Sequence, residues 1–383
     1  MGSQEPVVGH QERDDLDDRL DAVTAQPEPG VERPREQLIW QFAIQARACR
    51  TMGSELYTNL LTRALADLED QGPTWRLVRP HVAPGRGHAI ALRLLAAVHR
   101  LVLTSEAPHL EPFYASAGGQ ADPTAAWPAV RALLEDREHD LAPLVALACQ
   151  TNDPGRASLL AIGFLDVAAR TGQPIALTEI GTAAGLNLRW DRFHYAGGGQ
   201  RWGDPDRPGD LTGFWVDVPA IGDVQATVIS RRGVDRSPID ATTEEGELAL
   251  TSSVWGDQAA RFERLRGAID LARTEPAELV TADAVGWVEN NLAPIDGQTT
   301  VLAQSVLREY LDADSRRRLD AAVAAAGARA TVTAPLAWVQ LEPIDQQRRH
   351  GLRVTLWPGG ETRALTTAGS FGTDVRRVDA GAA

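Results

Sequence analysis

A glycine-rich stretch in the middle of the chain carries the residue types best suited to binding a small ligand. It reads Glu179-Ile-Gly-Thr-Ala-Ala-Gly185, with a carboxylate at its start and glycines at positions 181 and 185. Glycine permits a tight turn and a close approach of the backbone to a ligand, and a carboxylate accepts hydrogen bonds from amines and hydroxyls. We therefore expect a binding site formed by Glu179, Gly181, Thr182, Ala183, Gly185 and Asn187.

Two secondary-structure elements must position this stretch. The apolar run at 173–178 predicts a short buried strand, and the pattern at 186–190 predicts the first turns of a helix. A strand that turns directly into a helix aims backbone N–H groups and the positive end of the helix dipole at one point. An ordinary strand–helix turn has the same pattern, so this stretch alone does not separate a binding site from a plain turn.

The stretch resembles motif I of the class I S-adenosylmethionine-dependent methyltransferases, (D/E)-x-G-x-G-x-G. Ala183 takes the place of the middle glycine. The resemblance implies S-adenosylmethionine as the cofactor and a methyltransferase-like Rossmann sheet of seven strands with an antiparallel last hairpin. It implies a direct displacement at the sulfonium methyl, which depends mainly on alignment of the nucleophile.

The pattern after residue 174 supports an α/β fold. Strands are predicted at 226–235, 279–283, 299–306, 330–341, 352–357 and 363–367, and helices at 256–273, 284–292 and 314–326. Alternating strands and helices with short links predict a doubly wound, largely parallel sheet. The turn at Pro358-Gly-Gly360 predicts an antiparallel hairpin at its edge.

Polar residues end three of these strands. The resemblance gives Asp235 the role of binding ribose hydroxyls, gives Asp283 the adenine amino group, and places Ser305 in the reaction cleft. Asp235 lies much further from the glycines than the roughly 20 residues of the compact fingerprint, which we explain by an insertion near 196–225. The alternative for Asp235 is a turn aspartate, and Asp283 can cap the following helix as well as contact the adenine. The rivals for the ribose are then Asp191, Asp204 and Asp217.

The N-terminal part divides into two predicted segments. Residues 1–34 contain few large apolar side chains and are expected to be a disordered tail. Residues 35–150 show only helical patterns and form a predicted helical cap domain, followed by the methyltransferase-like domain at 151–372 and a tail at 373–383. We expect the polar residues near the start of the helix before the first strand to face the cofactor cleft, together with a Tyr-x-Ser loop. These cleft candidates are Tyr114, Ser116, Gln150, Asn152 and Arg156.

Composition narrows the classes of partner. A net charge of −14, from 52 acidic and 38 basic residues, argues against nucleic acid. No apolar run is long enough for a membrane span and no secretory signal is recognised, while Cys49 and Cys149 suggest reduced thiols in the cytoplasm. The histidines have no metal-ligand spacing. A small-molecule substrate is expected, and the oligomeric state is not encoded in any pattern.

Residues 36–370 resemble a bacterial family of unknown function, of the DUF2332 type. The shared features are the segments Tyr114–Gly119, Gln150–Arg156, Glu179–Asp191 and Arg201–Pro205. The leading hypothesis is a methyltransferase for a small molecule, and the alternative is a catalytically silent S-adenosylmethionine- or nucleotide-binding regulator of the same fold. A nucleotide-dependent oxidoreductase is a third hypothesis. No general base is identified, although Tyr114, His194 and Tyr310 are candidates.

Overall fold

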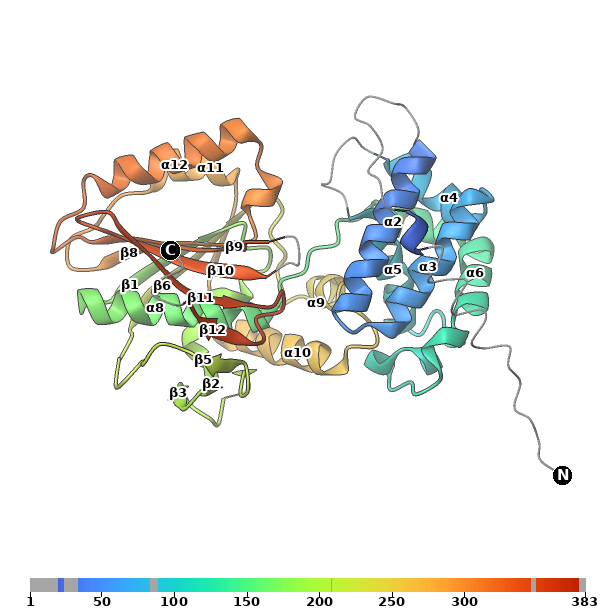
Figure 1. Cartoon of the computed structure of the whole chain (residues 1–383), viewed down its shortest axis with the longest axis horizontal. Coiled ribbons are helices and arrows are strands. Elements are labelled where there is room, and N and C mark those ends of the chain that lie inside the picture. The colour runs from blue at the N-terminus through green and yellow to red at the C-terminus, as the bar shows by residue number, and fades with distance from the viewer. Residues whose placement is uncertain (1–19, 24–33, 83–88, 208, 346–348, 379–383) are drawn as a thin grey trace. The chain divides into compact units, whose positions relative to one another are not determined.

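The computed structural model describes residues 20–23, 34–82, 89–207, 209–345 and 349–378. The chain forms two compact units (Figure 1). The first contains Met1–Gln150 and Leu248–Phe262, and the second contains Thr151–Glu247 and Glu263–Ala383. The chain passes between the units within helices α9 (Glu244–Ser252) and α10 (Ala259–Thr274).

The first unit is helical throughout its described residues. Ser54 caps α3 by accepting a hydrogen bond from the Tyr57 N–H, and the apolar positions of α3 fall on one buried face. Helix α5 is buried along most of its length, because its sequence is apolar on more than one side. The helices are α2 (Pro34–Thr51), α3 (Glu55–Glu69), α4 (Pro73–Val78), α5 (Ile90–Leu103), α6 (Trp127–Asp136) and α7 (Glu138–Ala146).

Residues 248–262 return to complete this first unit. The Asp257 carboxylate accepts hydrogen bonds from the Ser54 hydroxyl (2.7 Å) and from the Leu56 N–H (3.0 Å) at the start of α3. The Ser116 N–H donates to the Gly256 carbonyl at 2.9 Å. The helical unit is therefore built from two distant parts of the chain, whereas the sequence predicted one continuous segment.

Four residues of the expected disordered tail are packed. Leu20 is fully buried, and the Arg47 guanidinium donates to the Leu20 and Val23 carbonyl oxygens. The expectation of disorder is therefore wrong for residues 20–23, because a single buried leucine with a guanidinium partner orders a short turn. The rest of the predicted tail, at 1–19 and 24–33, lies outside the described residues, as do residues 379–383 of the predicted C-terminal tail.

A nine-stranded sheet forms the centre of the second unit. Its strand order is β5-β12-β11-β10-β9-β8-β1-β6-β7. This confirms the predicted α/β class and a mostly parallel sheet, but seven strands was wrong. The strands are β1 (Ile175–Ile180), β5 (Trp215–Asp217), β6 (Val228–Asp235), β7 (Glu278–Thr281), β8 (Thr299–Ser305), β9 (Leu336–Pro343), β10 (His350–Trp357), β11 (Glu361–Ala368) and β12 (Val375–Arg377).

Five neighbouring strands, β7, β6, β1, β8 and β9, run parallel. Numbered in chain order, they give 3-2-1-4-5, the order of a doubly wound sheet, with its switch point between β1 and β8. Every residue of β8 is buried, as expected for a central parallel strand covered on both faces. Figure 1 shows α11 (Ala284–Asn291) and α12 (Ala313–Gly327) on one face and α8 (Ala157–Thr171) on the other.

Three features around this core differ from the sequence prediction. The strands β9, β10, β11 and β12 pair antiparallel in succession, so the sheet continues beyond a single hairpin. A second sheet, which begins just before the predicted insertion and continues into it, is formed by β2 (Phe193–Gly197), β3 (Gln200–Trp202) and β4 (Gly209–Asp210). The helix expected after the glycine-rich stretch is replaced by a kinked 3₁₀ segment, η6 (Leu186–Arg192).

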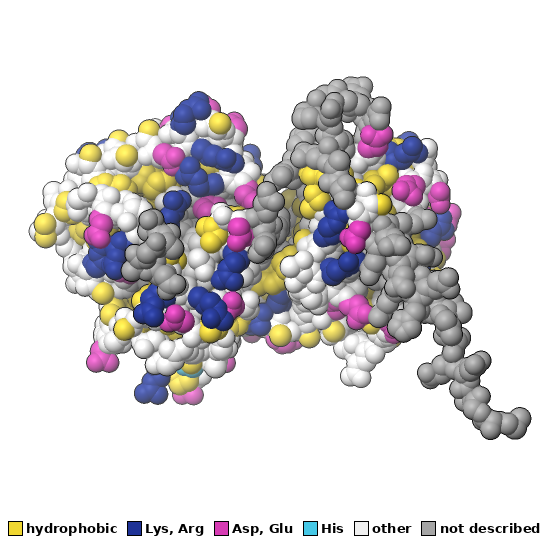
Figure 2. Space-filling model, in the orientation of Figure 1, with side chains coloured by type: hydrophobic (Ala, Val, Ile, Leu, Met, Phe, Trp, Pro, Cys, Tyr) yellow, Lys and Arg dark blue, Asp and Glu magenta, His cyan; other side chains and the backbone are white. Residues whose placement is uncertain are grey.

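No helix among the described residues has the length and apolarity that crossing a membrane requires. On the face drawn in Figure 2, basic and acidic side chains are both spread over the surface of the second unit.

Candidate functional site

The glycine-rich turn follows β1 directly, at the switch point of the sheet. Three alternate residues of this turn, Gly181, Ala183 and Gly185, have positive φ angles of +69°, +52° and +66°. Ala183 therefore adopts the left-handed conformation that glycine favours, although it has a side chain. Alanine therefore stands at a position of this turn where glycine would be free of strain.

Several N–H groups of this turn already have partners in the protein. The Ala183 N–H donates to Asp235 Oδ2 at 3.0 Å, and the Leu186 N–H donates to Asn152 Oδ1 at 2.8 Å. Gly181 and Gly185 donate to the carbonyls of Val234 (2.8 Å) and Thr182 (2.9 Å). A ligand at this turn therefore meets carboxylate and amide side chains more than free backbone donors.

Glu179 is the most perturbed acid of the turn. Its side chain lies at the end of β1 with only 3% of the residue exposed, and the Thr182 hydroxyl donates to it at 2.7 Å. Burial raises the pKa of Glu179 to about 7, against the lowering effects of Thr182 and of the nearby Arg156 guanidinium. A carboxyl group that titrates near neutral pH beside a turn is typical of binding and catalytic sites.

Asp235 lies beside the turn, as the sequence predicted from its place at the end of a strand. Strand β6 pairs parallel with β1, which brings Val234 opposite Ile180. Asp235 accepts hydrogen bonds from the N–H groups of Ala183 and Ser237, both at 3.0 Å. Each oxygen retains acceptor capacity for a ligand hydroxyl, so Asp235 can hold the turn and contact a ligand together.

The other strand-end residues have simpler surroundings. Asp283 is exposed and caps α11 by accepting from the Gly286 N–H at 2.9 Å. Ser305 ends β8, and its hydroxyl lies 3.4 Å from Arg156 Nη1. The capping role proposed for Asp283 is thus present, and its contact with an adenine remains a prediction.

Residues at the start of α8 approach the same edge of the sheet. Asp153 is the capping residue, accepting from the Gly155 N–H at 2.9 Å, while Asn152 bonds to the turn instead. Pro154–Arg156 form a short 3₁₀ turn ahead of α8. Asn152 is therefore joined to the turn, and Arg156, which lies near Glu179, is joined to β8.

Tyr114, Ser116 and Gln150 belong to the first unit. Tyr114 is fully buried there, and its ring stacks on His99 with the centroids 5.2 Å apart. His99 Nε2 lies 2.7 Å from the Ser116 hydroxyl, and burial lowers the pKa of His99 to about 4. The side chains of the Tyr-x-Ser loop therefore pack inside the helical unit. A cleft shared with Asn152 and Arg156 remains a prediction.

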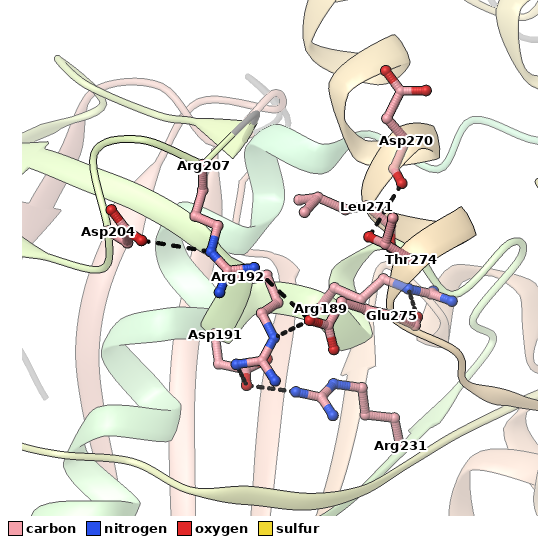
Figure 3. Close-up of polar contacts among 10 residues, drawn as sticks. All are labelled: Arg189, Asp191, Arg192, Asp204, Arg207, Arg231, Asp270, Leu271, Thr274 and Glu275. Atoms are coloured by element: carbon pink, nitrogen blue, oxygen red, sulfur yellow. Dashed lines mark hydrogen bonds and ion pairs between the residues drawn. The ribbon is translucent and has the colours of Figure 1, made fainter.

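The sequence analysis missed an ion-pair network formed by residues of η6 and their neighbours (Figure 3). Arg189 donates to the Gly185 carbonyl at 2.7 Å and to the Glu275 carbonyl at 2.8 Å. The buried Asp191 carboxylate pairs with Arg231 of β6 at 2.5 Å and with Arg192 at 3.2 Å. These contacts fix η6 against β6 and the end of α10, and they engage Asp191, one of the rival ribose ligands.

A buried acid at the end of β9 was also missed. Glu342 accepts a hydrogen bond from Gln304 Nε2 at 2.5 Å and lies 3.3 Å from the N–H groups of Leu307 and Arg308. The only sequence signal was a carboxylate at a strand end, which does not distinguish a buried acid from an exposed one.

The general-base candidates lie in three different environments. Tyr114 is buried in the helical unit, His194 lies 3.1 Å from Asp210, and Tyr310 is 64% exposed on the loop after β8. Among the described residues, no group of three or more His, Cys, Asp or Glu side chains is arranged to hold a metal ion.

Comparison with known proteins gives a family but no activity. No curated protein matches the sequence. The model of one family, described as "Uncharacterized protein conserved in bacteria (DUF2332)", matches residues 40–377. This match covers both units and the whole candidate site. The chain therefore belongs to the DUF2332 family of uncharacterised bacterial proteins.

Proposed function

We propose that the protein binds S-adenosylmethionine at the turn Glu179–Asn187 and is a methyltransferase acting on a small molecule. The observation that carries this proposal is that the carboxylates of Glu179 and Asp235 lie at the ends of the neighbouring strands β1 and β6, where Asp235 accepts a hydrogen bond from the Ala183 N–H of the turn. Two carboxylates suit a ligand that presents hydroxyls and a positive charge.

The same arrangement argues against a dinucleotide. A pyrophosphate is held by free backbone N–H groups at a glycine-rich turn. Here the Ala183 N–H is occupied by a carboxylate that would also repel a phosphate. This supports S-adenosylmethionine over the nucleotide-dependent oxidoreductase.

The residues present divide among the parts of such a ligand. Asp235 would accept hydrogen bonds from the ribose hydroxyls, and Glu179 would bind the ammonium group. The Arg156 guanidinium, beside Ser305, would bind the carboxylate. Asp283 is retained for the adenine amino group. S-adenosylmethionine supplies an activated methyl group, and the task of these residues is to orient it and to exclude water.

A second candidate is the catalytically silent regulator of the same fold. It is favoured by the surroundings of two base candidates, because Tyr114 is buried and His194 is paired with Asp210. The sequence contains no lysine, so its basic side chains other than histidine are arginines, which stay protonated. A nucleophile that carries no removable proton would need no base.

Isothermal titration calorimetry at pH 8 tests the binding site. Wild-type protein is titrated in parallel with S-adenosylmethionine, S-adenosylhomocysteine and NAD. We expect the first two to bind and NAD not to bind. Glu179→Gln, which keeps an acceptor for the Thr182 hydroxyl, should weaken S-adenosylhomocysteine binding by about 10- to 100-fold, because a charge-assisted hydrogen bond is lost.

The matched control is Glu278→Gln on β7, which removes an exposed carboxylate paired with Arg232. It should bind like wild type. Binding of NAD in preference to S-adenosylhomocysteine, or equal affinities in the Glu179→Gln and wild-type proteins, would refute the proposed site.

A further inference from the structure

The loop after β8 contains a backbone conformation that its residue disfavours. Val306 has a φ angle of +57°, in the left-handed region. Among the described non-glycine residues with positive φ, Val306 alone is branched at Cβ. A β-branched residue in this region is a steric outlier, and such strain persists only where the surrounding structure enforces it.

Strand β9 supplies the groups that enforce this conformation. The Val306 N–H donates to the Leu341 carbonyl at 2.8 Å. Beyond it, the Glu342 carboxylate lies 3.3 Å from the N–H groups of both Leu307 and Arg308. Glu342 is only 7% exposed, so these donors and Gln304 stabilise a buried charge. Leu341 and Glu342, two consecutive residues at the end of β9, therefore hold this loop in place.

The pinned loop borders the glycine-rich turn. A Cβ atom placed on Gly181 would lie 2.8 Å from Leu307 Cδ1, so the Leu307 side chain occupies the space above that glycine. Ser305, at the start of the same loop, lies 3.4 Å from Arg156. Movement of the loop would therefore displace Leu307 from Gly181 and Ser305 from Arg156.

We propose that Glu342 is a positioning residue for the ligand site, holding residues 305–308 in a strained conformation that places Leu307 against Gly181 and Ser305 beside Arg156. The ligand contact in this inference rests on the proposed function. A carboxylate with only a structural role could pin an unstrained loop equally well. The strained valine shows that one particular loop position is being enforced next to the turn.

The test combines ligand affinity with a double-mutant cycle. Glu342→Gln keeps the side-chain volume but replaces one acceptor oxygen by a donor group. It should weaken S-adenosylhomocysteine binding at least 10-fold by calorimetry. Val306→Gly relieves the strain at residue 306 but keeps the Glu342 contacts, so it should change the affinity for S-adenosylhomocysteine less than 3-fold. Glu309→Gln, an exposed carboxylate on the same loop, is the matched control and should change affinity less than 2-fold.

The urea midpoints in the double-mutant cycle show whether Glu342 enforces the strain at Val306. Val306→Gly should raise the urea midpoint of the otherwise wild-type chain, and this gain should vanish when Glu342→Gln is present, because the freed loop relaxes. Equal midpoint gains in the two backgrounds would overturn the inference, as would unchanged affinity in Glu342→Gln.

Two other results can also be interpreted: failure of Glu342→Gln to fold, and failure of the wild-type chain to bind S-adenosylhomocysteine. If Glu342→Gln does not fold, Glu342→Asp retains the charge but withdraws it from the loop, and the same affinity loss is expected. If the wild-type chain binds no S-adenosylhomocysteine, the proposed function fails. The midpoint cycle then decides by itself whether Glu342 holds the strained loop.

Discussion

Replacing Glu179 by glutamine should make the protein more stable at neutral and alkaline pH while weakening ligand binding. Glu179 is 3% exposed, and its pKa rises from 4.5 to about 7 in the folded protein. The largest cause is burial, which penalises the charged carboxylate. Glutamine has nearly the same shape, accepts the Thr182 hydrogen bond and carries no charge.

The magnitude follows from the linkage between proton binding and folding. Because the folded-state pKa is above the unfolded value, the folded chain keeps a proton between pH 4.5 and about 7 that the unfolded chain has released. Stability therefore falls as pH rises through this window and stays low above it. At 1.36 kcal/mol per pKa unit, the loss reaches about 3 kcal/mol, and the deep burial means that solvent screening reduces it little.

Urea denaturation of wild-type and Glu179→Gln proteins at several pH values between 5 and 8.5 measures this loss. We expect the two unfolding free energies to lie close together near pH 5 and the variant to be more stable by about 3 kcal/mol at pH 8. Glu278→Gln is again the matched control and should follow the wild-type curve. A Glu179→Gln protein that is less stable at pH 8, or whose difference from wild type does not change with pH, would refute the reasoning.

Three further predictions concern the stability of the fold. Ala183→Gly should raise the unfolding free energy by about 0.5 kcal/mol because its φ is +52°, whereas Ala184→Gly, at a position without positive φ, should lower it. Asp191→Asn should lower it by about 3 kcal/mol or more by leaving Arg231 without its buried partner, and adding Arg231→Met should recover much of that loss. Removal of residues 1–34 should lower the thermal midpoint relative to removal of 1–19, because only the first truncation loses Leu20; equal midpoints would show that Leu20 contributes nothing.

The sequence predicted the elements whose signals are local. Strand β1, the turn after it and β8 were found from apolar runs and glycines, although the predicted bounds of β1 are two residues early at each end and those of β8 extend one residue too far. Asp235 was placed at the end of a strand despite its distance from Gly181 in the chain. These predictions succeeded because parallel strands in a doubly wound sheet end at one edge. Residues predicted at the ends of neighbouring strands therefore lie near one another.

Features that depend on distant contacts could not be read in this way. The apolar pattern at 186–190 suggested a helix, but Arg189 there bonds to the Gly185 and Glu275 carbonyls and its φ and ψ depart from helical values. The bond between Asn152 and Leu186, and the pinning of the β8 loop by Glu342, likewise join residues far apart in sequence. Periodicity reports which face of an element is buried, and it carries no information about the partner of a polar side chain.

Three local conflicts of this chain lie at the edge of the sheet where the function is proposed. The Glu179 carboxylate is buried although it would be better hydrated in water. Ala183 and Val306 both have positive φ angles, which favour glycine and are strained for a β-branched residue such as valine. Glu179 lies at the end of β1, and Ala183 and Val306 lie on the loops that follow the neighbouring strands β1 and β8. Natural sequences break local rules chiefly at functional sites, where the surrounding fold can sustain the strain. Because substitutions as simple as Glu179→Gln and Ala183→Gly are expected to relieve two of these conflicts, their presence in the chain supports the proposal that this edge of the sheet binds a ligand.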